Sequence, residues 1–152
     1  MKLHFLHGTE TGNAEMVCED IEADLGGGYD VTISNMGDVD PGTLQADTFY
    51  FIVTSTYGNG DFPGAAVAFP DALEAGKPDL SHVRFAIFGL GDMVFAETFN
   101  HGSERLMKML IDCGAQMVGT RALHDASSLE MPEDTALPWA RDVLAQLQAA
   151  AA

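Results

Sequence analysis

Three short segments of the chain combine glycines, hydroxyl groups and aromatic rings in a pattern that suits a phosphorylated, flat ligand. The first, residues 7–14, reads HGTETGNA and carries Thr9 and Thr11 beside two glycines. Backbone N–H groups in such a loop attract an anion together with the N-terminus of the helix that follows. Residues 3–76 contain no Lys or Arg, so a phosphate bound here would be held by neutral donors alone.

The first segment also lacks the Gly-Lys-Ser/Thr ending of a P-loop, whose Lys reaches the outer phosphates of a nucleotide. A single monoester phosphate is therefore the better match. Glu10 would repel this phosphate if its carboxylate turned inward, so we expect only the Glu10 backbone N–H to take part. An ordinary strand-to-helix turn would use many of the same residues, so this segment alone leaves both interpretations open.

The second and third segments each place one aromatic ring among glycines. Residues 55–63 read STYGNGDFP and residues 89–95 read GLGDMVF. Tyr57 and Phe95 are suited to clasping a flat heterocycle between them, although either ring taken alone is more often explained by ordinary packing. Gly58 follows the first ring, and a glycine peptide turns its carbonyl either way at little steric cost. That freedom suits a ligand whose protonation changes.

Alternating strands and helices are predicted to bring the three segments together. Strands are expected at residues 2–6, 29–33, 48–54, 84–90 and 116–123, and helices at residues 13–25, 66–75, 102–113 and 138–149. The two central strands are almost continuously apolar, as in parallel sheets covered by helices on both faces. In the second helix, Pro70 either fits the opening turn of a helix that begins near Val67 or kinks a longer helix.

This alternation predicts a doubly wound α/β fold with a five-stranded parallel sheet in the order 2-1-3-4-5. Residues 1–152 are expected to form a single domain, because neither a linker nor an internal repeat interrupts them. In such sheets the ligand lies beyond the carboxyl ends of the strands, at the switch point between strands 1 and 3. All three segments follow strands that end at this edge.

The three segments together resemble the flavodoxin family, and they look closest to MioC-type flavodoxins and to the FMN domains of diflavin reductases. The resemblance implies a flavodoxin-like three-layer sandwich that binds FMN non-covalently. It implies that the FMN is surrounded by Thr9, Glu10, Thr11, Gly12, Asn13, Ala14, Ser55, Thr56, Tyr57, Gly58, Asn59, Gly60, Leu90, Gly91, Asp92, Phe95, Phe99 and Asn100. Within this set, Tyr57 and Phe95 would flank the flavin ring, and the Gly58-Asn59 peptide would serve flavin N5.

Two positions depart from the family pattern. Phe95 stands where these relatives usually carry Tyr, so stacking is kept and a hydroxyl is lost. Ala14 stands where many long flavodoxins place Thr, which removes one phosphate hydrogen bond. The chain also lacks the long insertion within strand 5 that marks long-chain flavodoxins, so it resembles a short-chain member.

The resemblance implies an electron carrier that shuttles single electrons between a reductase and an acceptor enzyme, with no catalytic residues of its own. The chain carries 23 acidic and 7 basic residues, a net charge of −16. This charge favours basic-surfaced redox partners and disfavours nucleic acid and anionic membranes. Four carboxylates, those of Glu10, Asp61, Asp92 and Glu97, are expected to oppose the addition of negative charge to the flavin.

Two other functions could use a fold of this kind. A flavin-dependent quinone or nitro reductase using NAD(P)H remains the alternative, although the sequence shows neither a second nucleotide site nor a substrate-binding domain. A receiver domain of the same topology would need clustered acidic residues at the end of strand 1, where this chain has His7-Gly8.

The remaining sequence features predict a cytoplasmic, monomeric protein without a metal site. No apolar run approaches a membrane span, and Met1 with Lys2 leads directly into a short apolar strand without room for a signal peptide. The five histidines lack the spacing of metal ligands and are expected to be solvated or structural. Cys18 and Cys113 are each expected within a helix, as buried reduced thiols.

Overall fold

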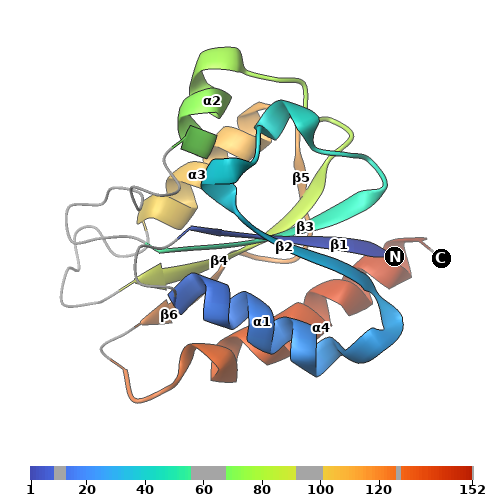
Figure 1. Cartoon of the computed structure of the whole chain (residues 1–152), viewed down its shortest axis with the longest axis vertical. Helices are drawn as coiled ribbons and strands as arrows, with labels where there is room; N and C mark the ends of the chain where they lie inside the picture. Colours follow the sequence, from blue (N-terminus) through green and yellow to red (C-terminus); the bar gives the residue numbers. More distant parts are fainter. Residues whose placement is uncertain (9–12, 56–67, 92–100, 126–127, 152) are drawn as a thin grey trace.

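The computed structural model describes residues 1–8, 13–55, 68–91, 101–125 and 128–151 (Figure 1). The strands are β1 (Lys2–Gly8), β2 (Asp30–Asn35), β3 (Thr48–Ser55), β4 (Arg84–Gly91), β5 (Gln116–Met117) and β6 (Ala122–Asp125). The helices are α1 (Asn13–Leu25), α2 (Ala68–Gly76), α3 (His101–Asp112) and α4 (Pro132–Ala151). The strands form one parallel sheet in the order β2-β1-β3-β4-β5, with β6 also paired to β4. The predicted α/β fold and strand order are confirmed.

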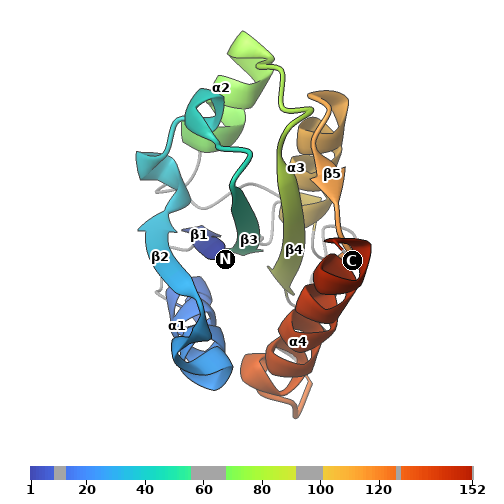
Figure 2. The ribbon, with the colours of Figure 1, turned by 90° about the vertical axis from the view of Figure 1, so that its right-hand side faces the viewer.

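Alternate side chains of the central strands enter two separate hydrophobic cores. In β3, Phe49, Phe51 and Val53 join the core under α1 and α4, whereas Tyr50 and Ile52 join the core under α2 and α3. Figures 1 and 2 show the two helix pairs on opposite faces of the sheet. Because both faces are covered, nearly every side chain of β3 is buried, which explains its continuous apolar run.

The strand predicted at residues 116–123 is divided into β5 and β6, so the sheet has six strands rather than five. Between the two pieces, Gly119 has a φ of +75°, in the left-handed region that favours glycine. A Cβ atom at this position would lie 3.3 Å from Cγ2 of Val143 on α4. The prediction of one strand was therefore wrong, because this glycine turns the chain within residues 116–123.

The fourth helix begins at Pro132, not at Pro138 as predicted. A proline is favoured at the first position of a helix, and the prediction chose the wrong one of two prolines. Asp134 Oδ2 accepts a hydrogen bond from the Met131 N–H at 3.1 Å, which satisfies a backbone donor at the start of α4. The second helix begins at Ala68, and Pro70 lies in its opening turn as expected. No helix in the described parts of the chain is long and apolar enough to cross a membrane.

Candidate functional site

The carboxyl ends of β1, β3 and β4 lie next to one another at one edge of the sheet. Gly8 is in register with Thr54, and Ser55 is in register with Leu90. Since β1 is paired with β2 on one side and β3 on the other, this edge contains the switch point of the doubly wound sheet. The three segments singled out by their sequence all leave the sheet from these adjacent strand ends.

The structure places five of the predicted site residues at this edge. Asn13 begins α1, Ala14 lies in its first turn, Ser55 ends β3, and Leu90 and Gly91 end β4. The other predicted residues lie outside the described part of the chain: Thr9, Glu10, Thr11, Gly12, Thr56, Tyr57, Gly58, Asn59, Gly60, Asp92, Phe95, Phe99 and Asn100.

The first turn of α1 supports an anion site at this edge. Ala14 is fully buried, so the helix begins packed into the domain rather than projecting from it. The first backbone N–H groups of a helix have no partner within the helix, and the 13-residue α1 carries a partial positive charge at its N-terminus. These donors require no cation, which agrees with the absence of Lys and Arg from residues 3–76.

His7 is a feature of this edge that the sequence-based site residues did not include. Its side chain is only 7% exposed, and its buried Nδ1 atom has no hydrogen-bond partner among the residues that the structure describes. Burial lowers the pKa of His7 below its usual value, although the carboxylates of Glu15, Glu19 and Asp38 act to raise it. The signal in the sequence was the position of His7, two residues before Thr9.

The described edge fits a phosphorylated flavin. It offers a helix N-terminus, the ends of three adjacent strands and a buried polar atom with an unused hydrogen-bonding position. A buried polar atom without a partner is costly, and functional sites are among the places where it is found. These observations concern the frame of the site, because Tyr57 and Phe95, which are predicted to flank the flavin ring, lie outside the described part of the chain.

Three other histidines have structural partners. His4 Nε2 lies 2.9 Å from Ser34 Oγ, His82 Nε2 lies 2.9 Å from the Leu44 carbonyl oxygen, and His124 Nε2 lies 2.8 Å from the Glu130 carbonyl oxygen. Burial lowers the pKa of His4. Among the described residues, no three His, Cys, Asp or Glu side chains are grouped as they would be to hold a metal ion.

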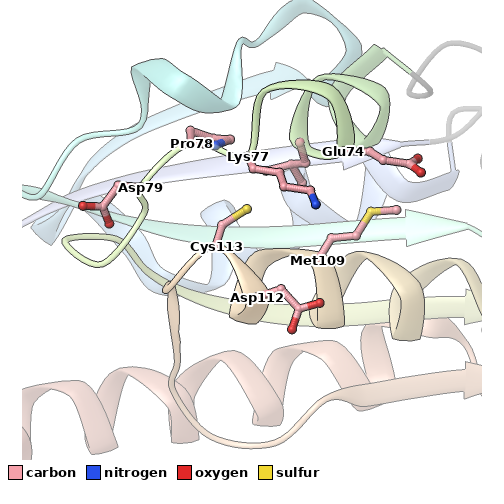
Figure 3. A pocket seen from close by; sticks show the side chains of 8 residues that line it. Glu74, Lys77, Pro78, Asp79, Met109, Asp112 and Cys113 are labelled. Carbon is pink, nitrogen blue, oxygen red and sulfur yellow. The ribbon is translucent and has the colours of Figure 1, made fainter.

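The two cysteines are free thiols in different settings. Cys18 is fully buried in α1, as expected, and burial raises the pKa of its thiol. Cys113 corrects the prediction, because it lies just beyond the end of α3 and is only partly buried. The chain turns out of the helix here, and Cys113 lines a cavity of about 590 Å³ between α2 and α3 (Figure 3).

This cavity is distinct from the candidate site. It lies beside the C-terminal ends of α2 and α3, and Glu74, Asp79 and Asp112 line it together with Lys77. None of the described residues that line it is a predicted site residue. Burial and Asp112 raise the pKa of Cys113 although Lys77 lowers it, so the thiol stays protonated and weakly nucleophilic near neutral pH.

The chain resembles known proteins over most of its length. The chain is 37% identical over 158 residues to "Pyruvate dehydrogenase [NADP(+)]" of Cryptosporidium parvum, which covers 97% of this chain and 8% of that protein. It is 34% identical over 96 residues to "Protein MioC" of Escherichia coli strain K12, covering 63% of this chain and 65% of that protein. It superposes on a cysteine-to-alanine mutant of flavodoxin from Pseudomonas aeruginosa with a TM-score of 0.80 and 27% identity, covering 96% and 99% of the two chains.

The chain spans a quarter or less of several other curated relatives that it matches, such as 24% of the sulfite reductase flavoprotein alpha-component of Bacillus subtilis. Likeness to such relatives therefore concerns one domain of a longer protein. The family profile described as Flavodoxin matches residues 6–139, which include the frame of the candidate site and all three segments. The chain belongs to the flavodoxin family, and it is a flavodoxin-like, FMN-binding electron-transfer domain.

Proposed function

We propose that this chain is an electron carrier that takes electrons singly from a reductase and passes them to an acceptor enzyme, without being a stand-alone catalyst. The observation that supports the proposal most strongly is that the carboxyl ends of β1, β3 and β4 lie together at the switch point of the sheet. The N-terminus of α1 follows the first of these strands. FMN supplies the redox chemistry when bound, and the protein supplies its position and electrostatic surroundings. Residues 1–152 are proposed to act as one FMN-binding domain.

The phosphate is proposed to be held by neutral donors from residues 9–14 and the α1 N-terminus. Thr11→Val removes one hydroxyl donor and should weaken FMN binding about tenfold, because hydrogen bonds to charged groups are among the stronger ones. Riboflavin has no phosphate, so its affinity should stay unchanged. Thr32→Val, an exposed threonine on β2, is the matched control. Equal losses for FMN and riboflavin would contradict the phosphate role.

The flavin ring is proposed to lie between Tyr57 and Phe95, with the Gly58-Asn59 peptide near N5. Replacing either ring with Ala should weaken both FMN and riboflavin about tenfold, since stacking acts on the ring rather than the phosphate. Flavin fluorescence, which neighbouring aromatic rings quench, should rise in both variants. Tyr29→Ala removes an aromatic ring from the α1 and α4 face and serves as the control.

The reaction type is tested by reductive titration of the pure holoprotein. A carrier should show two resolved one-electron steps and negligible steady-state oxidation of NADH or NADPH on its own. Rapid turnover of a quinone or nitro compound with NAD(P)H would instead identify the chain as a reductase. The comparisons favour the carrier, because the matched relatives and structures include flavodoxins and flavoprotein components of larger reductases.

The partners are proposed to carry basic surfaces, because the chain carries a net charge of −16. The same charge disfavours self-association and binding to nucleic acid, so a monomer is proposed. A cytoplasmic location is proposed from the sequence. Association rates that fall steeply with added salt would support the charge argument, and rates independent of salt would contradict it.

A further inference from the structure

Exposed apolar side chains lie around the N-terminal end of α4. Met16 is 60% exposed, Leu129 is 104% exposed and Met131 is 57% exposed. Single exposed apolar residues are normal on protein surfaces. Here, however, three of the five large apolar side chains that are exposed in the described part of the chain line one cavity. Their clustering indicates an interaction surface rather than chance exposure.

Hydrogen bonds hold this surface in place. The Glu130 carbonyl oxygen is bonded to the ring of His124 at 2.8 Å, and the Asp125 carbonyl oxygen accepts bonds from the Ser128 backbone N–H at 3.0 Å and hydroxyl at 2.7 Å. The backbone on either side of Leu129 is thereby tied to β6, so the fully exposed leucine belongs to a structured turn. Asp134 fixes the Met131 N–H in the same way.

Carboxylates surround the apolar side chains. Asp20, Glu130 and Glu133 line the same cavity of about 370 Å³, and the described residues of its lining include neither Lys nor Arg. We call this surface, formed by Met16, Leu129, Met131, Asp20, Glu130 and Glu133, the methionine patch. A second copy of the chain would bring the same negative charges and a further net charge of −16. Charge complementarity therefore favours a partner of the opposite sign.

The methionine patch lies close to the strand end from which a ring-binding segment departs. His124, in the cavity lining, is in register with Leu90, and Asp125 is in register with Gly91 at the end of β4. Figure 1 shows the starts of α1 and α4 on the same face of the sheet, next to β6. A partner seated on the patch would thus lie beside the carboxyl edge that holds the candidate site.

We propose that the methionine patch is the docking surface for an electron-transfer partner, and that this partner presents an apolar projection flanked by Lys or Arg. The apolar side chains would be covered on binding, while the three carboxylates would pair with the cations around the projection. This proposal rests on the proposed carrier function and specifies where the carrier is held by its partner.

The test uses oxidised cytochrome c, a strongly basic haem protein, as the probe. Holoprotein is reduced with dithionite, separated from the excess reductant without oxygen, and then mixed with the cytochrome in a stopped-flow instrument. One electron leaves the reduced holoprotein for each haem iron converted from Fe(III) to Fe(II). The double variant Leu129→Ser with Met131→Gln should lower the second-order rate about tenfold, as loss of a central apolar contact does in protein interfaces. Ile111→Gln, at a 45% exposed residue of α3 on the other face, should stay within about twofold of wild type.

A second pair of variants tests the charges. Glu130→Gln with Glu133→Gln should lower the rate about threefold to tenfold at low salt and flatten its salt dependence. Asp71→Asn with Glu74→Gln removes the same number of charges from exposed positions on α2 and should have a much smaller effect. Equal effects of the two pairs would show that net charge alone steers the partner, which would overturn the patch.

A third measurement uses the wild-type protein, so it does not depend on whether the variants fold. In wild-type protein with isotope-labelled methionine methyl groups, adding cytochrome c should shift the signals of Met16 and Met131. The signals of Met107 and Met109, in the core cluster on the other face, should remain in place. Shifts confined to that other face would overturn the proposal.

The outcomes separate the two proposals. Holoprotein that reduces neither ferricyanide nor cytochrome c would contradict the carrier function itself. Holoprotein that reduces both, while the patch variants match the Ile111→Gln control, would contradict the docking surface alone. Concentration-dependent dimers that disappear in the Leu129 and Met131 variant would identify a second copy as the occupant and likewise overturn the proposal.

Discussion

At the scale of single residues, His7 shows how the candidate site departs from ordinary strand structure. A buried strand residue usually carries an apolar side chain or a polar one with its partners in place. His7 differs, because its Nδ1 atom is buried at the carboxyl end of β1 and the described part of the chain offers it no hydrogen-bond partner. This arrangement lowers the free energy of unfolding of the domain, by an amount that depends on pH.

His7 predicts a specific loss of stability in mild acid. Because burial lowers its pKa in the folded protein, the unfolded chain binds the proton first, and stability falls as the pH drops below about 6.5. In His7→Phe, the apoprotein should gain about 1 kcal/mol at pH 5.5 from the loss of the unpaired polar atom. It should also show a weaker pH dependence between pH 7.5 and 5.5 in urea unfolding. An unchanged pH dependence would contradict this account.

At the scale of elements, α4 carries a feature that works against its own stability. Pro138 lies inside the helix, where it cannot donate a backbone hydrogen bond and its ring crowds the carbonyl of the preceding turn. Pro138→Ala should therefore raise the free energy of unfolding, by about 1–3 kcal/mol, when it is measured with urea. Ala145→Gly, at an exposed position of the same helix, should instead lower it by about 1 kcal/mol. A destabilised Pro138→Ala variant would contradict the continuous helix.

The turn between β5 and β6 gives a second prediction at this scale. Gly119→Ala places a Cβ in the left-handed region and 3.3 Å from Val143 Cγ2. It should lower the free energy of unfolding by about 1–2 kcal/mol. Gly27→Ala, where nothing lies within 4 Å and φ is not positive, is the control and should have little effect. Equal stability of the two variants would argue against the division of the strand at Gly119.

The elements also show what the sequence could predict. Continuous apolar runs made β3 and β4 recognisable, and Gly26 with its two following glycines marked the end of α1. The start of α4 was missed because tertiary packing decides which of two prolines begins the helix. The break at Gly119 was missed because the φ of a single glycine also depends on tertiary packing. At the site, strand order brought together the three segments, whereas His7 required knowledge of its burial.

At the scale of the whole molecule, the electrostatics are dominated by acidic residues, of which the chain has 23 against 7 basic ones. The exposed carboxylates repel one another, and salt screens this repulsion over a distance that shortens from about 10 Å at 0.1 M to about 3 Å at 1 M. NaCl should therefore raise the thermal midpoint, by about 2–4 °C for each kcal/mol of repulsion relieved. Equiosmolar sucrose controls for effects of solute crowding. A midpoint that falls with NaCl would contradict this expectation.

The same charge distribution links stability to partner choice. Lys and Arg are absent from residues 3–76, and the methionine patch has carboxylates without cations in its lining. The negative charge of the chain thus has two effects. Its carboxylates repel one another, and they also favour fast association with basic proteins. The relation depends on the charge of the whole chain rather than on any one of the three glycine-containing segments.

The central claim, that these three strand ends hold FMN, is tested most directly by the purified protein itself. We expect a yellow protein with a flavin absorption spectrum, which releases one FMN per chain on denaturation and takes FMN up again on refolding. A colourless protein that fails to bind added FMN would contradict the account.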